Sequence, residues 1–192
     1  MFYMQELLGD SNNRDFCFTN TKAKGALISI IRSGKRVNPQ TYPSNPFEVT
    51  MHLAEDHPGL LLPSFIGNTH QYFMVQKEIA DIILQHNVDE VQVFPFTLMN
   101  HKNRVHSKDY VFLNPLGIYD CLNHDLSDFK RRKSGAIRGV RKYVIDKEKV
   151  QDLPDLFRVK EDSSEIFYSK RLVDRLREEK VTNFVIKEIE VG

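Results

Sequence analysis

Apolar residues first recur at helical spacing and then alternate with polar residues in two stretches of the chain, residues 75–98 and 168–191. In the first stretch the apolar residues around Ile79 share one helical face, and the alternation begins at Val91. A change of period from 3.6 residues to two indicates a helix followed by a strand. Each stretch is therefore predicted to form a helix–turn–strand unit, and Ser169 is the predicted N-cap of the second helix.

The second stretch repeats the first at a constant offset of 93 positions, with no gap. Seven apolar positions correspond at this offset: Ile79/Leu172, Ala80/Val173, Ile83/Leu176, Val91/Phe184, Val93/Ile186, Phe96/Ile189 and Leu98/Val191. In both strands the apolar phase shifts by one position, which predicts a β-bulge or bend near Val93 and near Ile186. The repeat favours a single domain with two related halves, about 1–100 and 101–192, although any two helix–turn–strand units share part of this pattern.

Further strands are predicted within residues 47–54, 109–123 and 140–150, where apolar and polar residues alternate in short runs. Strands of this kind are typical of sheets with one face in solvent, whereas a doubly wound parallel sheet needs strands that are apolar throughout. The expected fold class is therefore α+β, with a mixed or mainly antiparallel sheet that contains the two helix–turn–strand units.

The composition is that of an ordinary soluble domain. Hydrophobic residues make up 41% of the 192 residues, and 27 Lys and Arg against 26 Asp and Glu leave a formal net charge of +1. A chain that binds nucleic acid through its overall charge is expected to be strongly basic, and a DNA mimic strongly acidic. The charge balance argues against both classes.

The segment MFYMQELLGD at the start of the chain lacks the basic residues of a secretory signal, and no apolar run approaches the roughly 18 residues of a membrane helix. The two cysteines, Cys17 and Cys121, are too few and too far apart to indicate a disulfide framework. We therefore expect a cytoplasmic protein with free thiols and no membrane segment.

Candidate catalytic chemistry is sparse. The chain has no glycine-rich phosphate loop and no GxSxG, HExxH or CxxC motif. Cys121 and His124 are spaced as a possible zinc pair or as a thiol and its base, with His101 and His106 as possible further ligands. The His-x₄-His spacing suits neither one helical face nor a common metal hairpin. We therefore predict no metal, no cofactor and no enzymatic activity.

A basic segment is the most conspicuous local feature. Between residues 130 and 142 the chain carries seven Lys or Arg residues and no acid. Such a segment can be a solvated loop, or it can bind an acidic protein face or phosphate groups. No aromatic residue lies between these cations to stack on bases, which makes nucleic acid the weakest of the three interpretations.

The order of several segments resembles a known family. LPSF is followed by VQKEIADIILQHNVDEVQVFPF, VFLNPLGIYDCLNHDLSDF, RKYVIDKEKVQDLPDLFRV and IFYSKRLVDRLREEKVTNFVIKEI. Over residues 40–192 this resembles the bacterial immunity proteins of polymorphic toxin systems, immunity family eleven, formerly a domain of unknown function. The matching positions are Leu156, Phe157, Arg158, Ser169, Leu172 and Leu176, whereas KVTNFVI stands where relatives often carry a glycine-containing segment.

The resemblance implies a small cytoplasmic protein that binds and neutralises a cognate toxin of a contact-dependent or type VI/Rhs-type system. The resemblance assigns no catalytic residue to this chain. The expected contact surface is the polar middle of the chain, since long charged loops on a rigid scaffold suit binding. The candidate partner-binding residues are His101, Arg104, His106, Asp109, His124, Asp125, Arg131, Arg132 and Arg138. The alternative function is a nucleic-acid-binding or regulatory module that uses the basic segment.

Overall fold

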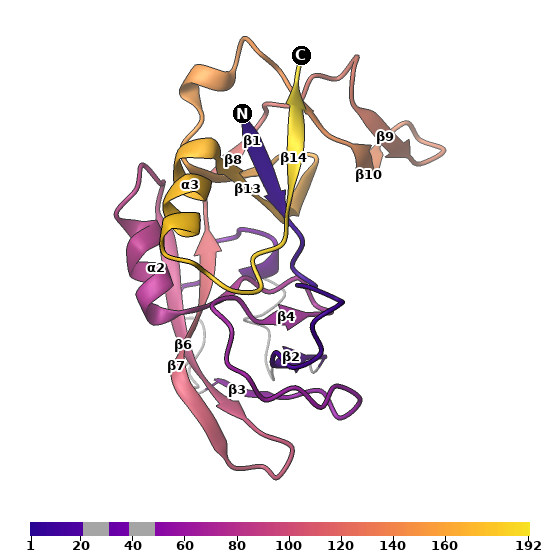
Figure 1. The fold of residues 1–192 in the computed structure, drawn as a ribbon. Coiled ribbons are helices and arrows are strands. Elements are labelled where there is room, and N and C mark those ends of the chain that lie inside the picture. Colours follow the sequence, from indigo (N-terminus) through magenta and orange to yellow (C-terminus); the bar gives the residue numbers. More distant parts are fainter. Residues whose placement is uncertain (21–30, 39–48) are drawn as a thin grey trace.

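The computed structural model describes residues 1–20, 31–38 and 49–192 (Figure 1). Its strands are β1 (Phe2–Gln5), β2 (Phe18–Thr19), β3 (Val49–His52), β4 (Gly67–Asn68), β5 (Met74–Gln76), β6 (Val91–Met99), β7 (Val105–Pro115), β8 (Ile118–Tyr119), β9 (Asp128–Arg131), β10 (Ile137–Lys142), β11 (Val144–Ile145), β12 (Leu156–Val159), β13 (Asp162–Ser169) and β14 (Ile186–Val191). The helices are α2 (Lys77–Leu84), α3 (Lys170–Glu178) and the 3₁₀ helix η2 (Val150–Asp152). Among these residues no helix is both long and apolar enough to cross a membrane.

The strands form two main sheets. One has the order β3-β6-β7-β5 and the other β11-β14-β1-β13-β12-β8, while β2 pairs with β4 and β9 with β10. Antiparallel pairs predominate, with parallel pairs at β3–β6, β11–β14, β12–β8 and β2–β4. The predicted α+β class with mixed sheets is confirmed.

Both helix–turn–strand units occur in the same setting. Strand β6 lies between a parallel neighbour, β3, and an antiparallel neighbour, β7, while β14 lies between parallel β11 and antiparallel β1. Strands β5 and β13, which lead into the two helices, pair antiparallel with β7 and β1. The helices begin at Lys77 and Lys170, which correspond at the offset of 93. The two units therefore have corresponding strand neighbours, and β1 takes in the second sheet the place that β7 has in the first.

The predicted bulges are wrong in position and in cause. Strand β14 pairs with β1 without a register shift, and the shifts in β6 fall between Phe96 and Met99. Val91 and Val93 face the helices, whereas Phe94 and Phe96 face a second core on the other side of the sheet. Because successive strand residues point to opposite faces, the apolar phase changes where the strand passes from one core to the other.

Three apolar cores hold the molecule together, and the central one contains both helices. It includes Ile79, Ala80, Ile83, Leu172, Val173 and Leu176, together with residues of both sheets. The outer face of the four-stranded sheet packs on a second core, and that of the six-stranded sheet on a third. The helices contact each other, and α3 lies above α2 on the same side of the molecule (Figure 1). The sequence period therefore placed the buried helical faces correctly.

A Leu-Pro turn holds the start of each helix. The carbonyl oxygen of Ser64, after Pro63, accepts a hydrogen bond from Gln76 N at 3.0 Å. The carbonyl of Asp155, after Pro154, accepts one from the N-cap residue of α3 at 2.9 Å. Gln76 is the N-cap residue of α2, as Ser169 is of α3. Each turn therefore accepts a hydrogen bond from the N-cap residue of the helix in its own unit.

The side chains of the same two turns reach the loop after the opposite helix. Ser64 Oγ accepts a hydrogen bond from Thr182 N at 3.1 Å, after α3. An Asp155 carboxylate oxygen accepts one from Asn87 N at 3.2 Å, after α2. A backbone bridge between Val88 and β12 adjoins this second contact. The two contacts are approximate counterparts, because each unit donates from its post-helix loop and accepts at its Leu-Pro turn.

Asp155 carries more of this connection than Ser64. Its side chain is only 6% exposed and also accepts hydrogen bonds from Arg171, from His86 Nδ1 at 3.3 Å and from the Ser169 hydroxyl. Ser169 in turn accepts from the backbone N–H of residue 172, which confirms it as the N-cap. Burial by itself raises the pKa of Asp155, but the donors, Arg171 and Ser169 foremost, bring it below its ordinary value.

We expect Asp155→Ala to lower the free energy of unfolding by about 2–4 kcal/mol, because it removes the buried carboxylate that four donors share. Ser64→Ala, the counterpart change, removes one neutral acceptor and should cost about 1 kcal/mol. Urea unfolding followed by circular dichroism measures both. Equal losses, or a loss below about 1 kcal/mol for Asp155→Ala, would contradict the unequal roles of the two turns.

Arg158 is a fully buried cation held by backbone oxygens. Its guanidinium donates to the carbonyls of Pro115, Arg32, Ser163 and Ile31. Burial lowers the pKa of Arg158 to about 10, so it stays protonated at neutral pH. A salt bridge is not needed to hold it, since its donors are satisfied by carbonyl dipoles.

Glu165, on β13, is a partly buried acid near this arginine. Burial, followed by the charge of Asp162, raises its pKa to about 7, and Gln71 donates a hydrogen bond to its Oε1 at 3.1 Å. The folded state therefore holds the proton more tightly than the unfolded state, in which the pKa is about 4.5. This contribution to stability is fully present below about pH 4.5 and is lost as the pH rises through about 7.

We predict that Glu165→Gln removes this loss. Between pH 5 and pH 8 the free energy of unfolding of the native protein should fall by about 2–3 kcal/mol relative to that of the variant. Urea unfolding of both proteins at the two pH values measures the difference, in which the other titrating groups cancel. Parallel pH profiles would show that Glu165 ionises in the folded state as it does in the unfolded chain.

Candidate functional site

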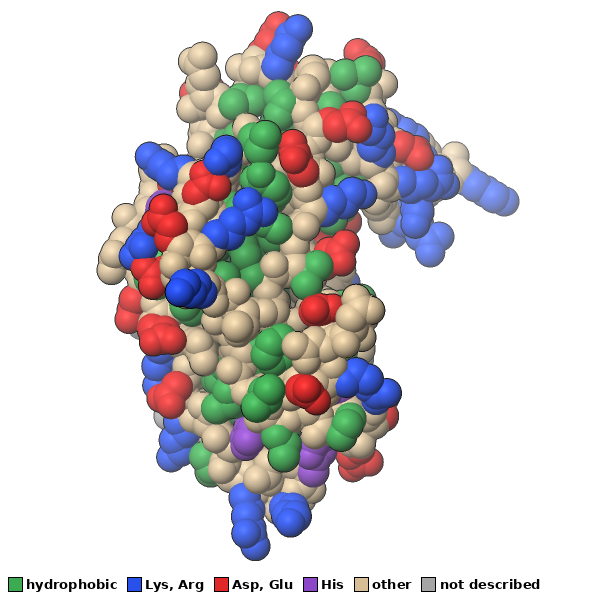
Figure 2. Space-filling model, in the orientation of Figure 1, with side chains coloured by type: hydrophobic (Ala, Val, Ile, Leu, Met, Phe, Trp, Pro, Cys, Tyr) green, Lys and Arg blue, Asp and Glu red, His purple; other side chains and the backbone are tan. Residues whose placement is uncertain are grey.

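The basic segment forms a hairpin that projects from the body. Strands β9 and β10 pair antiparallel, and the seven cations of residues 130–142 are all exposed. Figure 2 shows their side chains gathered on this arm, with a hollow between the arm and the body below it. We call residues 128–142 the basic hairpin.

The tip and the base of the basic hairpin are ordered by local contacts. Arg132 N donates to Ala136 O at 2.8 Å across the turn, and Gly135 has a φ of +84°, a conformation that glycine adopts without strain. At the base Phe129 and Val140 pack on the third core. The arm is thus a regular turn on an anchored base, and its charged tip is directed into solvent.

Most of the cationic charge on the hairpin is uncompensated. Arg141 pairs with Asp128 at 3.4 Å and Lys142 with Glu190 at 2.8 Å, both on the surface. Among the described residues no ion pair within 4.0 Å involves Arg131, Arg132 or Arg138. Positive charge without nearby acids attracts anionic groups of a partner.

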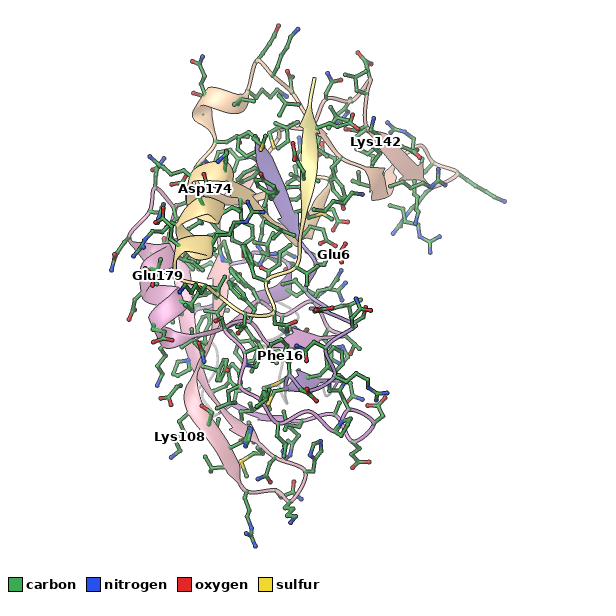
Figure 3. The ribbon with its side chains drawn as sticks, in the orientation of Figure 1. Glu6, Phe16, Lys108, Lys142, Asp174 and Glu179 are labelled. Carbon is green, nitrogen blue, oxygen red and sulfur yellow. The ribbon has the colours of Figure 1, made fainter. Side chains whose placement is uncertain are left out.

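The structure does not bring the predicted partner-binding residues together. His101, Arg104 and His106 lie at the turn between β6 and β7, at the end of the molecule opposite the basic hairpin (Figure 1). Figure 3 shows the same separation between Lys108, beside this turn, and Lys142 of the basic hairpin. The candidate residues therefore belong to two separate surfaces.

Two of these histidines hold the β6–β7 turn against the body. His101 Nε2 lies 3.1 Å from the carbonyl oxygens of Ala54 and His57, and His106 Nε2 lies 2.9 Å from that of Leu60. Because a carbonyl only accepts, Nε2 carries the proton in both rings. These contacts have a structural purpose.

Two of the candidate residues, His101 and Asp109, line cavities in the described part of the chain. The larger, of about 440 Å³, is lined by Asn20, His52, Leu53, Glu55, Asp56, Asn100, His101 and Asn103. Asp109 borders a separate cavity of about 370 Å³ with Gln76, Lys77 and Glu78. Both are open and polar, unlike the enclosed apolar pockets in which proteins usually bind small molecules.

His124 and Asp125 lie in a tight turn at the base of the basic hairpin. The Asn123 side chain accepts hydrogen bonds from Asp125 N at 3.0 Å and from Leu126 N at 3.2 Å. His124 Nε2 lies 2.7 Å from an oxygen of Glu161, a partner that no sequence spacing indicated. These two candidates therefore belong with the basic hairpin and not with the β6–β7 turn.

Cys121 and His124 do not form the nucleophilic thiol site that the sequence analysis considered. Cys121 is 1% exposed, and burial, followed by the negative charge of Glu161, raises the pKa of its thiol to about 12. A nucleophilic cysteine needs an accessible thiolate. His124 faces Glu161 instead of activating the sulfur.

Residues 2–191 match the immunity protein family Imm11, so the match covers nearly the whole chain. The chain belongs to this family. A comparison with curated proteins gave no match. The family resemblance noted from the sequence is thus confirmed.

We expect both thiols to resist modification in the folded protein, because burial also raises the pKa of Cys17 to about 12. Iodoacetamide at pH 8 should label neither cysteine within an hour in buffer and both in 6 M guanidinium, as read by mass spectrometry of the intact chain. Rapid labelling of Cys121 alone in the native protein would restore the case for a reactive thiol.

Proposed function

We propose that this protein is a non-enzymatic, cytoplasmic immunity protein that binds and neutralises a cognate bacterial toxin of a contact-dependent or type VI/Rhs-type system. Family membership supports the immunity function. The observation that supports neutralisation by binding is the basic hairpin, an exposed arm with seven cations and a hollow beneath it. We propose the hairpin as the contact surface and an acidic face of the toxin as its partner.

The shape and charge of the hairpin suit this task. Arg131, Arg132 and Arg138 lie on the projecting part, where their planar guanidinium groups can form paired hydrogen bonds with carboxylates. Because β9 and β10 are already paired and their base is packed on a core, binding does not have to order a disordered segment. Uncompensated charge of one sign also speeds the encounter with an acidic partner.

The same cations would attract phosphate groups, and a nucleic-acid-binding or regulatory function is the second candidate. Single-stranded nucleic acid is usually held by exposed aromatic rings on which bases stack. On this arm Phe129 packs against the third core, and the hydroxyl of Tyr143, directly after the arm, donates to Asp162 at 3.2 Å. This arrangement favours a protein partner.

The test is charge reversal at the hairpin. Replacing Arg131, Arg132 and Arg138 with Glu should weaken binding of the cognate toxin at least about a thousandfold, because three hot-spot contacts become repulsive. Calorimetry with the purified toxin domain measures the affinity, and survival of cells that express the toxin measures protection. The thermal unfolding midpoint should stay within about 2 °C, since all three residues are exposed.

The matched control reverses three cations at the opposite end: Lys102, Arg104 and Lys108. This variant should bind and protect as the native protein does. Loss of protection in the control together with full protection by the hairpin variant would place the interface at the β6–β7 turn. Binding of RNA or DNA by the native protein that weakens steeply with salt and is lost in the hairpin variant would favour the second candidate.

A further inference from the structure

Three side chains from three separate segments converge beside the basic hairpin. Asp120 follows β8, His124 lies in the turn before β9, and Glu161 lies in the turn between β12 and β13. Each offers a carboxylate oxygen or a ring nitrogen, and these three atoms lie within 4.8 Å of one another. The fold has therefore gathered groups that are up to 41 positions apart in the chain.

Glu161 shows that the cluster is more than a chance grouping of surface acids. Its side chain is only 4% exposed, and one oxygen contacts His124 Nε2 at 2.7 Å. The other oxygen, Oε2, is buried and has no hydrogen-bond partner among the described residues. A buried carboxylate oxygen without a donor is costly, and a cation bound beside His124 would satisfy it.

We propose that Asp120, His124 and Glu161 bind a divalent transition-metal ion, with zinc as the best match. Zinc accepts both imidazole nitrogen and carboxylate oxygen as ligands, whereas magnesium and calcium prefer oxygen ligands alone. Atoms with this spacing share a point about 2.8 Å or less from each, and zinc bonds are about 2.0–2.2 Å long, so the ligands need to close by under about 1 Å.

We expected no metal here because the spacing of the histidines in the sequence fitted neither one helical face nor a common metal hairpin, and the ligands considered with His124 were Cys121 and distant histidines. The structure replaces the thiol with Asp120 and Glu161, which no spacing motif connects. The inference stands on this geometry and does not depend on the proposed binding of a toxin.

Two lysines compete with the metal for Asp120. Lys160 Nζ lies 2.6 Å from one of its oxygens and Lys149 Nζ 3.8 Å from the other. Both ammonium groups are on the surface, where ion pairs are weak and easily exchanged. A metal ion would replace the Lys160 contact and would join the His124 turn to the β12–β13 turn. Since the His124 ring packs 4.9 Å from Phe129, this link would stiffen the base of the basic hairpin.

Titration calorimetry with zinc chloride alone, on the full-length protein stripped with a chelator, tests the site. We expect one zinc ion per chain with a Kd in the micromolar range or tighter. His124→Ala should weaken binding about tenfold or more, and Glu161→Gln should do the same while keeping the size of the side chain. Lys160→Ala should tighten it about two- to fivefold, because it frees Asp120.

His101→Ala is the matched control, since it removes an exposed histidine at the other end of the molecule. It should bind zinc as the native protein does. Zinc should also raise the thermal unfolding midpoint of the native protein and of this control but not that of His124→Ala. No zinc binding by the native protein, undiminished binding by His124→Ala, or an equal loss in the control would each overturn the site.

Discussion

The buried carboxylate of Asp155 is the contact on which the rest of the fold depends. It accepts hydrogen bonds from the loop after α2 and from the start of α3, so one side chain spans both helix–turn–strand units. Neither sheet can bury its helix-side face alone, because the central core takes side chains from both helices and both sheets. With Ser64 as its smaller counterpart, Asp155 sets how the two units meet and thereby holds the central core closed.

The sequence predicted the two units well because their signal is local. A helical face followed by alternation depends only on neighbouring residues, and Ser169 was a correct N-cap for the same reason. The strand partners could not be predicted, because pairing of β1 with β13 and β14 joins the two ends of the chain. The apolar phase change was misinterpreted because a strand that serves two cores resembles a bulged strand with one buried face.

The candidate surface was predictable only in part. Contiguous cations made the basic hairpin evident, but no sequence signal separated it from the β6–β7 turn. Strand β7 has eleven residues and is therefore about 35 Å long, so residues that are near in sequence emerge at opposite ends of the molecule. The Asp120, His124 and Glu161 cluster was missed because its members meet only through the turn between β12 and β13.

The position of β1 has a consequence for the order in which the protein folds during synthesis. The four strands of the first sheet all lie within residues 49–115, so that sheet can assemble while later residues are still being made. The second sheet needs β1 between β13 and β14, which leave the ribosome long after β1 does. The apolar strand β1 must therefore stay unpaired until β13 and β14 have been made, and their pairing is the slow, non-local step of folding.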